Sequence, residues 1–457
     1  MNAVLIRNGS LVSPSGIRKA DLLMKDGKIA RIGEGLPTEG AEVVDAAGKL
    51  VFPGFIDAHT HFDLHVAGTV TADDFASGTA AALAGGTTTI IDFGTQYPGE
   101  TLMQGLENWR KKAAAGTSCD YGFHMSITDW NPETSAECER MMEEGVTTFK
   151  LYLTYDTMVD DKTCFQILRR LKEIGALTGV HCENAGMIDA LREEYAADDR
   201  IRQVSSHYKT RPAAAEAEAI GRLLHMAEVC DIPVIDVHLT CLEGLNEIRA
   251  ARKRGQKVYV ETCPQYLCMD QSLYELPGFE GARYVIAPPL RTTADNEALW
   301  EALAAGEIDT VSTDHCSFTL AQKALGREDF RKIPGGMPGV ETRGAVIYSE
   351  GVHRGRITAE KMCEVLAENP AKLYGLYPKK GVLAEGADAD VVLLDPGRSR
   401  TITAAEQLSR ADYAPLEGRT LTGTMDQVYL RGELCAADGQ VLVRNRGEFV
   451  KRGRCTL

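Results

Sequence analysis

Apolar residues in the central part of the chain occur in short runs, separated by longer stretches with helical spacing. The short runs predict eight strands, over Phe55–His59, Thr88–Phe93, Tyr121–Ser126, Thr147–Tyr152, Leu177–His181, Val234–His238, Val258–Thr262 and Asp309–Thr313. The stretches between them are rich in Ala, Leu, Glu and Arg, and they predict helices such as Asp74–Ala84, Cys164–Ile174, Ala213–Val229 and Leu242–Arg252. Strands that alternate with helices in this way indicate a parallel sheet.

Eight such units favour a (β/α)₈ TIM-like barrel, an α/β fold, over an open sheet. A doubly wound sheet is the alternative. It would place a glycine-rich Gly-x-Gly-x-x-Gly turn after the first strand and gather the polar residues at one switch point. No such turn follows Phe55–His59, and polar residues stand at the ends of many strands. The barrel is therefore the predicted fold.

Both ends of the chain have a different pattern, with short alternating strands punctuated by glycines. Near the start these pieces are Ala3–Ile6, Ala20–Met24, Ile29–Ile32 and Val43–Asp45, and near the end Ala389–Leu394, Val428–Leu430 and Val441–Val443. Each set is thin for a core of its own, so we expect the two to pair. The prediction is a discontinuous β-sandwich domain of residues 1–52 and 383–457, with the barrel over residues 53–382.

Composition narrows the classes of partner. The 457 residues carry a formal net charge of −15, which argues against nucleic acid or an anionic membrane. No apolar stretch is long enough to span a bilayer, and the first residues lack the pattern of a secretory signal. The 12 cysteines include no Cys-x-x-Cys pair, so neither a disulfide framework nor a thiolate zinc module is indicated. We expect a cytoplasmic protein with a small-molecule partner.

Polar residues recur at the predicted carboxyl ends of the strands, where barrel enzymes place their catalytic groups. His59 and His61 are two residues apart on a strand and so share a face. A single strand-end histidine is more often a hydrogen-bonded structural residue. The complete set has the nitrogen and oxygen preference of Zn²⁺ or a similar divalent ion, and comprises His59, His61, Lys150, His181, His238 and Asp314.

Lys150 ends a strongly apolar strand, and this admits two interpretations. A lysine at the barrel rim can extend its ammonium into solvent while its stem stays buried. In a dry site beside cations it would instead lose its proton, and the neutral amine could take up carbon dioxide as a carbamate. The carbamate would be an anion with two oxygens, able to bridge two metal ions.

Six segments carry a resemblance to a known family. They are His59-Thr60-His61-Phe62-Asp63, Phe149-Lys150-Leu151-Tyr152-Leu153-Thr154-Tyr155, Val180-His181-Cys182-Glu183-Asn184, Val237-His238-Leu239-Thr240, Glu261-Thr262-Cys263-Pro264-Gln265-Tyr266 and Ser312-Thr313-Asp314-His315-Cys316. In this order they resemble the cyclic-amide amidohydrolases, and within them the hydantoinase and dihydropyrimidinase group. The resemblance runs through nearly the whole chain.

The resemblance implies a centre with two divalent ions, Zn²⁺ by expectation and Mn²⁺ as the alternative. His59, His61 and Asp314 would hold one ion, and His181 and His238 the other. N6-carboxylysine at Lys150 and a hydroxide would bridge them. The hydroxide would attack the carbonyl of a cyclic amide, so that 5-substituted hydantoins and dihydropyrimidines open to N-carbamoyl amino acids. Asp314 would carry the proton, and Tyr155 would stabilise the oxyanion.

The substrate-binding positions depart from the family pattern. The family usually has serine where Ala287 stands and asparagine where Gly335 stands, positions thought to hold the ring amide through backbone groups. The exocyclic substituent is expected to meet a mostly apolar wall. That wall is made of Leu64, Val66, Tyr152 and Val159.

Two alternatives stay open beside this hypothesis. One is a related ring-opening enzyme, an allantoinase or a dihydroorotase, although no basic residue can be assigned to a dihydroorotate carboxylate. The other is a non-catalytic assembly protein of the same fold, which would have lost its ligands, whereas all six positions are occupied here. In each case we expect a homo-oligomer, either a dimer or a tetramer.

Overall fold

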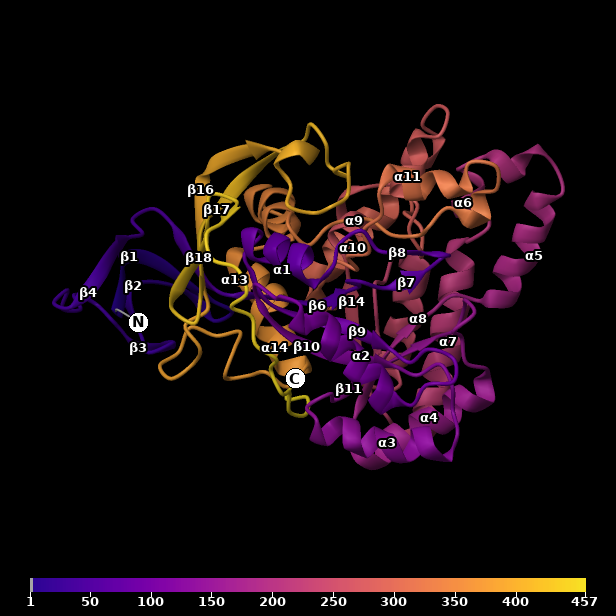
Figure 1. Cartoon of the computed structure of the whole chain (residues 1–457), viewed down its shortest axis with the longest axis horizontal. Helices are drawn as coiled ribbons and strands as arrows, with labels where there is room; N and C mark the ends of the chain where they lie inside the picture. Colours follow the sequence, from indigo (N-terminus) through magenta and orange to yellow (C-terminus); the bar gives the residue numbers. More distant parts are fainter. Residues whose placement is uncertain (1–2) are drawn as a thin grey trace.

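The computed structural model describes residues 3–457 and divides into two architectures (Figure 1). Strands from both ends of the chain lie side by side at one end of the molecule. The remainder is a parallel barrel surrounded by helices. Within the described residues, no helix is both long enough and apolar enough to cross a membrane.

The barrel confirms the predicted fold class. Its strands are all parallel and follow the order β15-β14-β13-β12-β11-β10-β9-β6. Their bounds are β6 Phe55–Thr60, β9 Thr87–Thr95, β10 Asp120–Ser126, β11 Thr148–Tyr152, β12 Leu177–His181, β13 Val234–Asp236, β14 Val258–Thr262 and β15 Thr310–Val311. β13 and β15 are shorter than predicted because the chain turns out of the sheet before His238 and Asp314, which both have positive φ.

Between β15 and β6 the barrel is closed by a single backbone bridge and by the side chain of Arg343, and not by a continuous ladder of backbone hydrogen bonds. One parallel bridge joins Thr60 to His315. Lower in the barrel the buried guanidinium of Arg343 donates to the carbonyl of Ile56 at 2.7 Å and to that of Val311 at 2.9 Å. Arg343 therefore joins the first and last barrel strands where their backbones do not pair.

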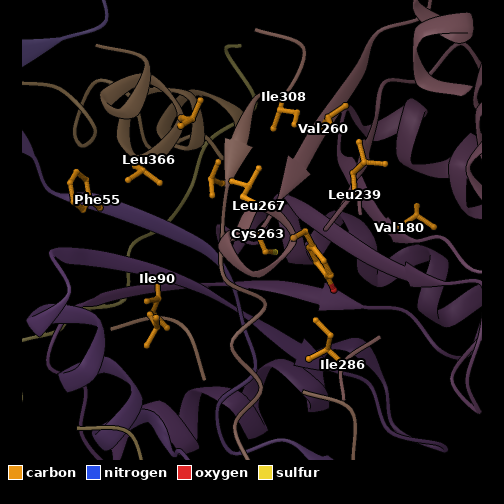
Figure 2. Close-up of a cluster of buried hydrophobic side chains, with 14 of the residues drawn as sticks. Phe55, Ile90, Val180, Leu239, Val260, Cys263, Leu267, Ile286, Ile308 and Leu366 are labelled. Atoms are coloured by element: carbon orange, nitrogen blue, oxygen red, sulfur yellow. The ribbon is translucent and has the colours of Figure 1, made fainter. Parts of the chain in front are cut away.

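Helices cover the outside of the barrel, and local sequence explains their limits. The longer ones are α1 Phe75–Ala84, α2 Leu102–Ala114, α3 Pro132–Glu143, α4 Asp161–Ile174, α5 Ala185–Ala196, α7 Ala213–Cys230, α8 Leu242–Lys253 and α10 Thr293–Ala304. In α4, Asp160 caps the first turn and Gly175, in the left-handed region, ends the last. Apolar residues spaced three and four apart turn its buried face toward the sheet. Figure 2 shows part of the resulting core, with Val180, Leu239 and Val260 of neighbouring barrel units.

The terminal segments form one nine-stranded sheet. Its strands are β1 Ala3–Ser13, β2 Gly16–Lys25, β3 Lys28–Gly33, β4 Ala41–Asp45, β5 Leu50–Pro53, β16 Val391–Thr401, β17 Thr420–Leu430, β18 Glu433–Ala437 and β19 Gln440–Val441. β5 and β16 pair antiparallel, with Phe52 opposite Val392, so the two ends of the chain meet there. Buried residues from β1, β2, β5, β16 and β17 share a core separate from the barrel's, as a sandwich requires.

The last residues return to the barrel at the amino ends of its strands. The amide of Tyr121 donates to the carbonyl of Glu448 at 3.0 Å, and that of Val450 donates to the carbonyl of Tyr121 at 2.8 Å. The buried side chain of Arg452 donates to the hydroxyl of Thr148 at 2.9 Å. The tail thus packs on the barrel, although it follows the terminal sheet in sequence. The division at residues 52 and 383 stays a prediction.

Candidate active site at the carboxyl ends of the barrel strands

His59, His61 and Asp314 come together across the barrel seam. His59 lies on β6, His61 follows it, and Asp314 follows β15. One carboxylate oxygen of Asp314, Oδ1, lies 3.1 Å from Nε2 of His59 and 3.1 Å from Nε2 of His61. Asp314 reaches this point with a φ of 51°, a strained conformation of the kind that is common at functional sites. The three residues offer ligand atoms close enough together to share one metal ion.

His181 and His238 form a second pair of facing imidazoles. Nδ1 of His181 lies 3.0 Å from Nε2 of His238, and both side chains are buried. The other ring nitrogen of His181 lies 2.7 Å from the Glu183 carboxylate, which fixes the ring orientation. Two imidazole nitrogens that face each other in this way can converge on a cation.

Lys150 lies in the middle of β11 and is buried close to the histidines, since its charge acts on the pKa of both His59 and His238. It is 1 % exposed, and its Nζ has no hydrogen-bond partner within residues 3–457. The nearest aromatic rings are those of Phe93 and Tyr152, with centroids 5.0 and 5.3 Å from Nζ. Burial lowers the pKa of Lys150 to about 8, although Asp314 and Glu261 act in the opposite direction. The expectation of a buried, readily deprotonated amine thus agrees with the structure, and a solvent-exposed rim lysine does not.

Two glutamates support the histidines from behind, and neither was assigned a role from the sequence. Glu261 on β14 lies 2.6 Å from Nδ1 of His59, and Glu183 contacts His181. Burial lowers the pKa of His59, but Glu261 and Asp314 outweigh it and raise that pKa to about 9. The sequence did contain a signal, because Glu261 stands one residue before the end of a predicted strand and Glu183 two residues beyond a strand-end histidine.

The donor set fits divalent cations. His59, His61 and Asp314 form one group of possible ligands, and His238, which faces His181, has its ring centroid 5.4 Å from that of His59. The buried Nζ of Lys150, without a protein acceptor among the described residues, lies nearby. Burial raises the pKa of Asp314, but the charge of His59 and hydrogen bonds from both neighbouring histidines hold it well below the usual range. The carboxylate is therefore ionised. Nitrogen and oxygen ligands of this kind suit zinc and related ions.

Tyr155 stands at the mouth of this constellation. Its ring centroid lies 5.0 Å from that of His181, and the residue is 39 % exposed with a φ of 73°. In the described chain its hydroxyl makes no hydrogen bond with protein. The guanidinium of Arg211 lies 5.4 Å from its ring centroid. A strained tyrosine with a free hydroxyl beside the histidines is available to a ligand.

The predicted substrate positions fall into two groups. Ala287 and Gly335 are neighbours in space, since a Cβ on Gly335 would lie 3.8 Å from the Ala287 nitrogen. Of the predicted apolar wall, Leu64 and Tyr152 are half-buried and Val66 is exposed on the hairpin of β7 His65–Val66 and β8 Thr69–Val70. Val159 is buried in the main core, and its amide donates to the Tyr152 carbonyl at 3.1 Å. Val159 therefore contacts Tyr152 from the core side and does not line the exposed surface of the wall.

A parallel barrel with histidines and a carboxylate at the carboxyl ends of its strands is the architecture of the metal-dependent barrel hydrolases. The chain belongs to the amidohydrolase family, whose profile matches residues 50–435. It is 45% identical to a D-hydantoinase of Geobacillus stearothermophilus, over 98% of this chain and 96% of that one. It is 42% identical to a D-phenylhydantoinase of Escherichia coli (strain SE11), over 98% of both. A crystal structure of dihydropyrimidinase from Brevibacillus agri superposes with a TM-score of 0.97 at 40% identity, covering 100% of both chains.

Proposed function

We propose that this enzyme opens cyclic amides and ureides, namely 5-substituted hydantoins and dihydropyrimidines, to N-carbamoyl amino acids. The observation that carries the proposal is the convergence of four histidines, Lys150 and Asp314 at one end of the barrel. The identity of 40–45% with hydantoinases and a dihydropyrimidinase over nearly the whole chain supports it. Water is added across the ring C–N bond, its oxygen to the carbonyl carbon and a proton to the nitrogen.

We further propose that the site takes two divalent ions, zinc in the native protein with manganese as the alternative. His59, His61 and Asp314 would hold one, and His181 and His238 the other. Lys150 would stand between them as N6-carboxylysine, formed when its neutral amine adds carbon dioxide and releases a proton. The buried, unpartnered Nζ supports this, because an ammonium there would oppose two cations. When bound, such ions act as Lewis acids on a carbonyl and lower the pKa of water.

The side chains of this protein supply the proton transfers and the orientation. The ionised carboxylate of Asp314 can accept a proton from the attacking water and return it to the departing ring nitrogen. Glu261 and Glu183 hold the rings of His59 and His181 in one orientation. The hydroxyl of Tyr155 is free to donate to the oxyanion that develops on the carbonyl.

The ring amide would be held by backbone groups of Ala287 and Gly335. The exocyclic substituent would meet the wall of Leu64, Val66 and Tyr152, with Val159 behind it. We also propose that the protein is a cytoplasmic homo-oligomer, a dimer or a tetramer.

Ring opening by metal-replete protein tests the proposal. Dihydrouracil, hydantoin and 5-phenylhydantoin are to be incubated with the enzyme, and the N-carbamoyl products measured by chromatography.

Metal analysis of the purified protein is expected to give close to two divalent ions per chain. A stoichiometry that stays below one after growth in zinc or manganese would contradict the two-ion site. Hydrolysis of allantoin or dihydroorotate alone would favour the related ring-opening enzymes.

Tyr155→Phe is expected to lower kcat by roughly 10²–10³-fold, the usual effect of removing one oxyanion donor. Metal content should not change, because the hydroxyl is not among the ligands. The matched control is Tyr429→Phe in the terminal sheet, whose hydroxyl donates to Gln427 at 2.7 Å, and this variant should keep the wild-type rate. Loss of metal in Tyr155→Phe would show that the residue has another role.

A further inference from the structure

Lys323 is a buried lysine whose hydrogen-bond partners are all backbone carbonyls. It ends the short helix α11 Leu320–Lys323 and is 0% exposed. Its Nζ donates to the carbonyls of Val285 at 2.8 Å, Pro334 at 2.7 Å and Gly336 at 2.7 Å. No carboxylate in the described part of the chain lies within ion-pair distance of it. Burial lowers the pKa of Lys323 to about 7, and the three carbonyl oxygens match the three protons of its ammonium form.

The three carbonyls flank Ala287 and Gly335, the pair proposed to hold the ring amide. Val285 is two residues before Ala287, and Pro334 and Gly336 stand on either side of Gly335. The two segments are also joined directly, since the Gly336 amide donates to the Val285 carbonyl at 2.9 Å. Lys323 therefore joins both substrate-binding segments at one point.

Peptide geometry extends the effect to the groups that remain free. The carbonyl of Pro334 and the N–H of Gly335 belong to one trans peptide plane and point in opposite directions. Because Lys323 donates to the Pro334 carbonyl, the N–H of Gly335 points away from Lys323. Gly335 is exposed, and the backbone N–H and C=O groups of Gly335 and Ala287 make no hydrogen bonds among residues 3–457.

Within residues 3–457, Lys323 makes the only hydrogen bond to the Pro334 carbonyl, whereas the Ile286–Ala287 peptide is fixed by His207, whose Nε2 lies 2.7 Å from the Ile286 carbonyl. The segments 285–288 and 334–336 belong to no helix or strand. Burial of an ammonium costs free energy, and apolar residues of similar volume often stabilise a protein as well or better. Charge-assisted hydrogen bonds are, however, about twice as strong as neutral ones, and three of them define an orientation.

We propose that Lys323 is a positioning residue for substrate binding. It fixes the Pro334–Gly335 peptide plane and, through the carbonyls of Val285 and Gly336, holds this segment against the one that carries Ala287, so that the backbone groups of Gly335 stay oriented beside those of Ala287 for the amide of the substrate ring. The inference rests on the proposed ring-opening function and adds the residue that organises its ring-binding backbone.

The test is steady-state kinetics of Lys323→Met and Lys323→Gln with hydantoin and 5-phenylhydantoin. Misplaced backbone donors weaken ground state and transition state alike, so KM should rise about tenfold while kcat stays within about threefold. The factor should be similar for both substrates, because they share the ring. Glutamine keeps two N–H donors, so KM of Lys323→Gln should lie between those of wild type and Lys323→Met. Metal content should stay at the wild-type value.

Leu303→Ala is the matched control for lost stability. Leu303 is wholly buried on α10, so its truncation should lower Tm without changing KM. If both Lys323 variants lower Tm in the same way and keep the wild-type KM, Lys323 is only structural and the inference is overturned. A rise confined to 5-phenylhydantoin also overturns it, since the effect would then lie in the wall. If Lys323→Met does not fold, an unchanged KM in Lys323→Gln decides against the inference. If the wild type opens neither ring, the proposed function itself fails.

Discussion

Lys150→Ala is expected to lose its divalent ions and at least about 10⁴-fold in kcat, because Lewis-acid and acid–base contributions disappear together. The physical reason is the position of Lys150. Its buried Nζ has no protein acceptor, and burial lowers its pKa to about 8, so much of the amine is neutral near that pH and can bind carbon dioxide. Alanine removes the only side chain proposed to place an anion between the two histidine sets. Metal content and ring-opening rate measure the effect.

Chemical rescue separates a lost bridge from a damaged fold. Acetate or propionate, with excess zinc, should restore part of the metal content and of the rate in Lys150→Ala, since a short carboxylate can replace the carbamate. Lys372→Ala is the control, because Lys372 is a half-buried lysine on α14 Asn369–Leu373, paired with Glu368. It should keep both metals and the wild-type rate. Full metal content and rate in Lys150→Ala would refute the bridging role.

Asp314→Asn is expected to lower kcat by roughly 10²–10⁴-fold, the contribution of general acid–base catalysis, and to weaken metal binding. The amide cannot accept the proton of the attacking water. It also removes the negative charge that His59 and His61 face at 3.1 Å. The loss should exceed that of Tyr155→Phe, because Asp314 is proposed to be both ligand and proton carrier. Metal content and kcat of the two variants are to be compared under one condition.

Asp231→Asn is the matched control, because it makes the same change from aspartate to asparagine at a left-handed position outside the site. Asp231 caps the end of α7 in the same left-handed conformation, with φ 48° against 51° for Asp314, but its side chain is exposed and pairs with Lys172. Asparagine tolerates that conformation, so this variant should fold and keep the wild-type rate. Near wild-type activity in Asp314→Asn, together with metal loss in Tyr155→Phe, would show that both roles are assigned wrongly.

The barrel could be predicted because its information is local. Each strand is a short apolar run bounded by turn residues, and the helices between them have the spacing of an amphipathic face, as in α4. The strand-end positions of His59, His181 and Asp314 follow from the same pattern. Their convergence could be predicted only from the barrel, because a closed parallel sheet brings all its carboxyl ends to one face.

Other features depend on contacts between distant residues, and the sequence pattern does not contain them. Glu261 meets His59 across the barrel, and Arg343 reaches from beyond β15 to the carbonyl of Ile56. Nothing in the sequence distinguishes Lys323 from the other lysines of the chain. Only the path of the chain between residues 285 and 336 places its ammonium among three carbonyls.

The pairing of β5 with β16 has a consequence for the order in which the protein can fold. Translation proceeds from the amino end at ~5–20 residues per second, so β16 is completed tens of seconds after β5. Until then the edge of β5 that will meet Val392 is unpaired, and Val51 and Phe52 lack the neighbours that bury them. Unpaired edges of this kind invite association between nascent chains. The first strands of the terminal sheet therefore stay without their β16 partner for most of the synthesis of the chain.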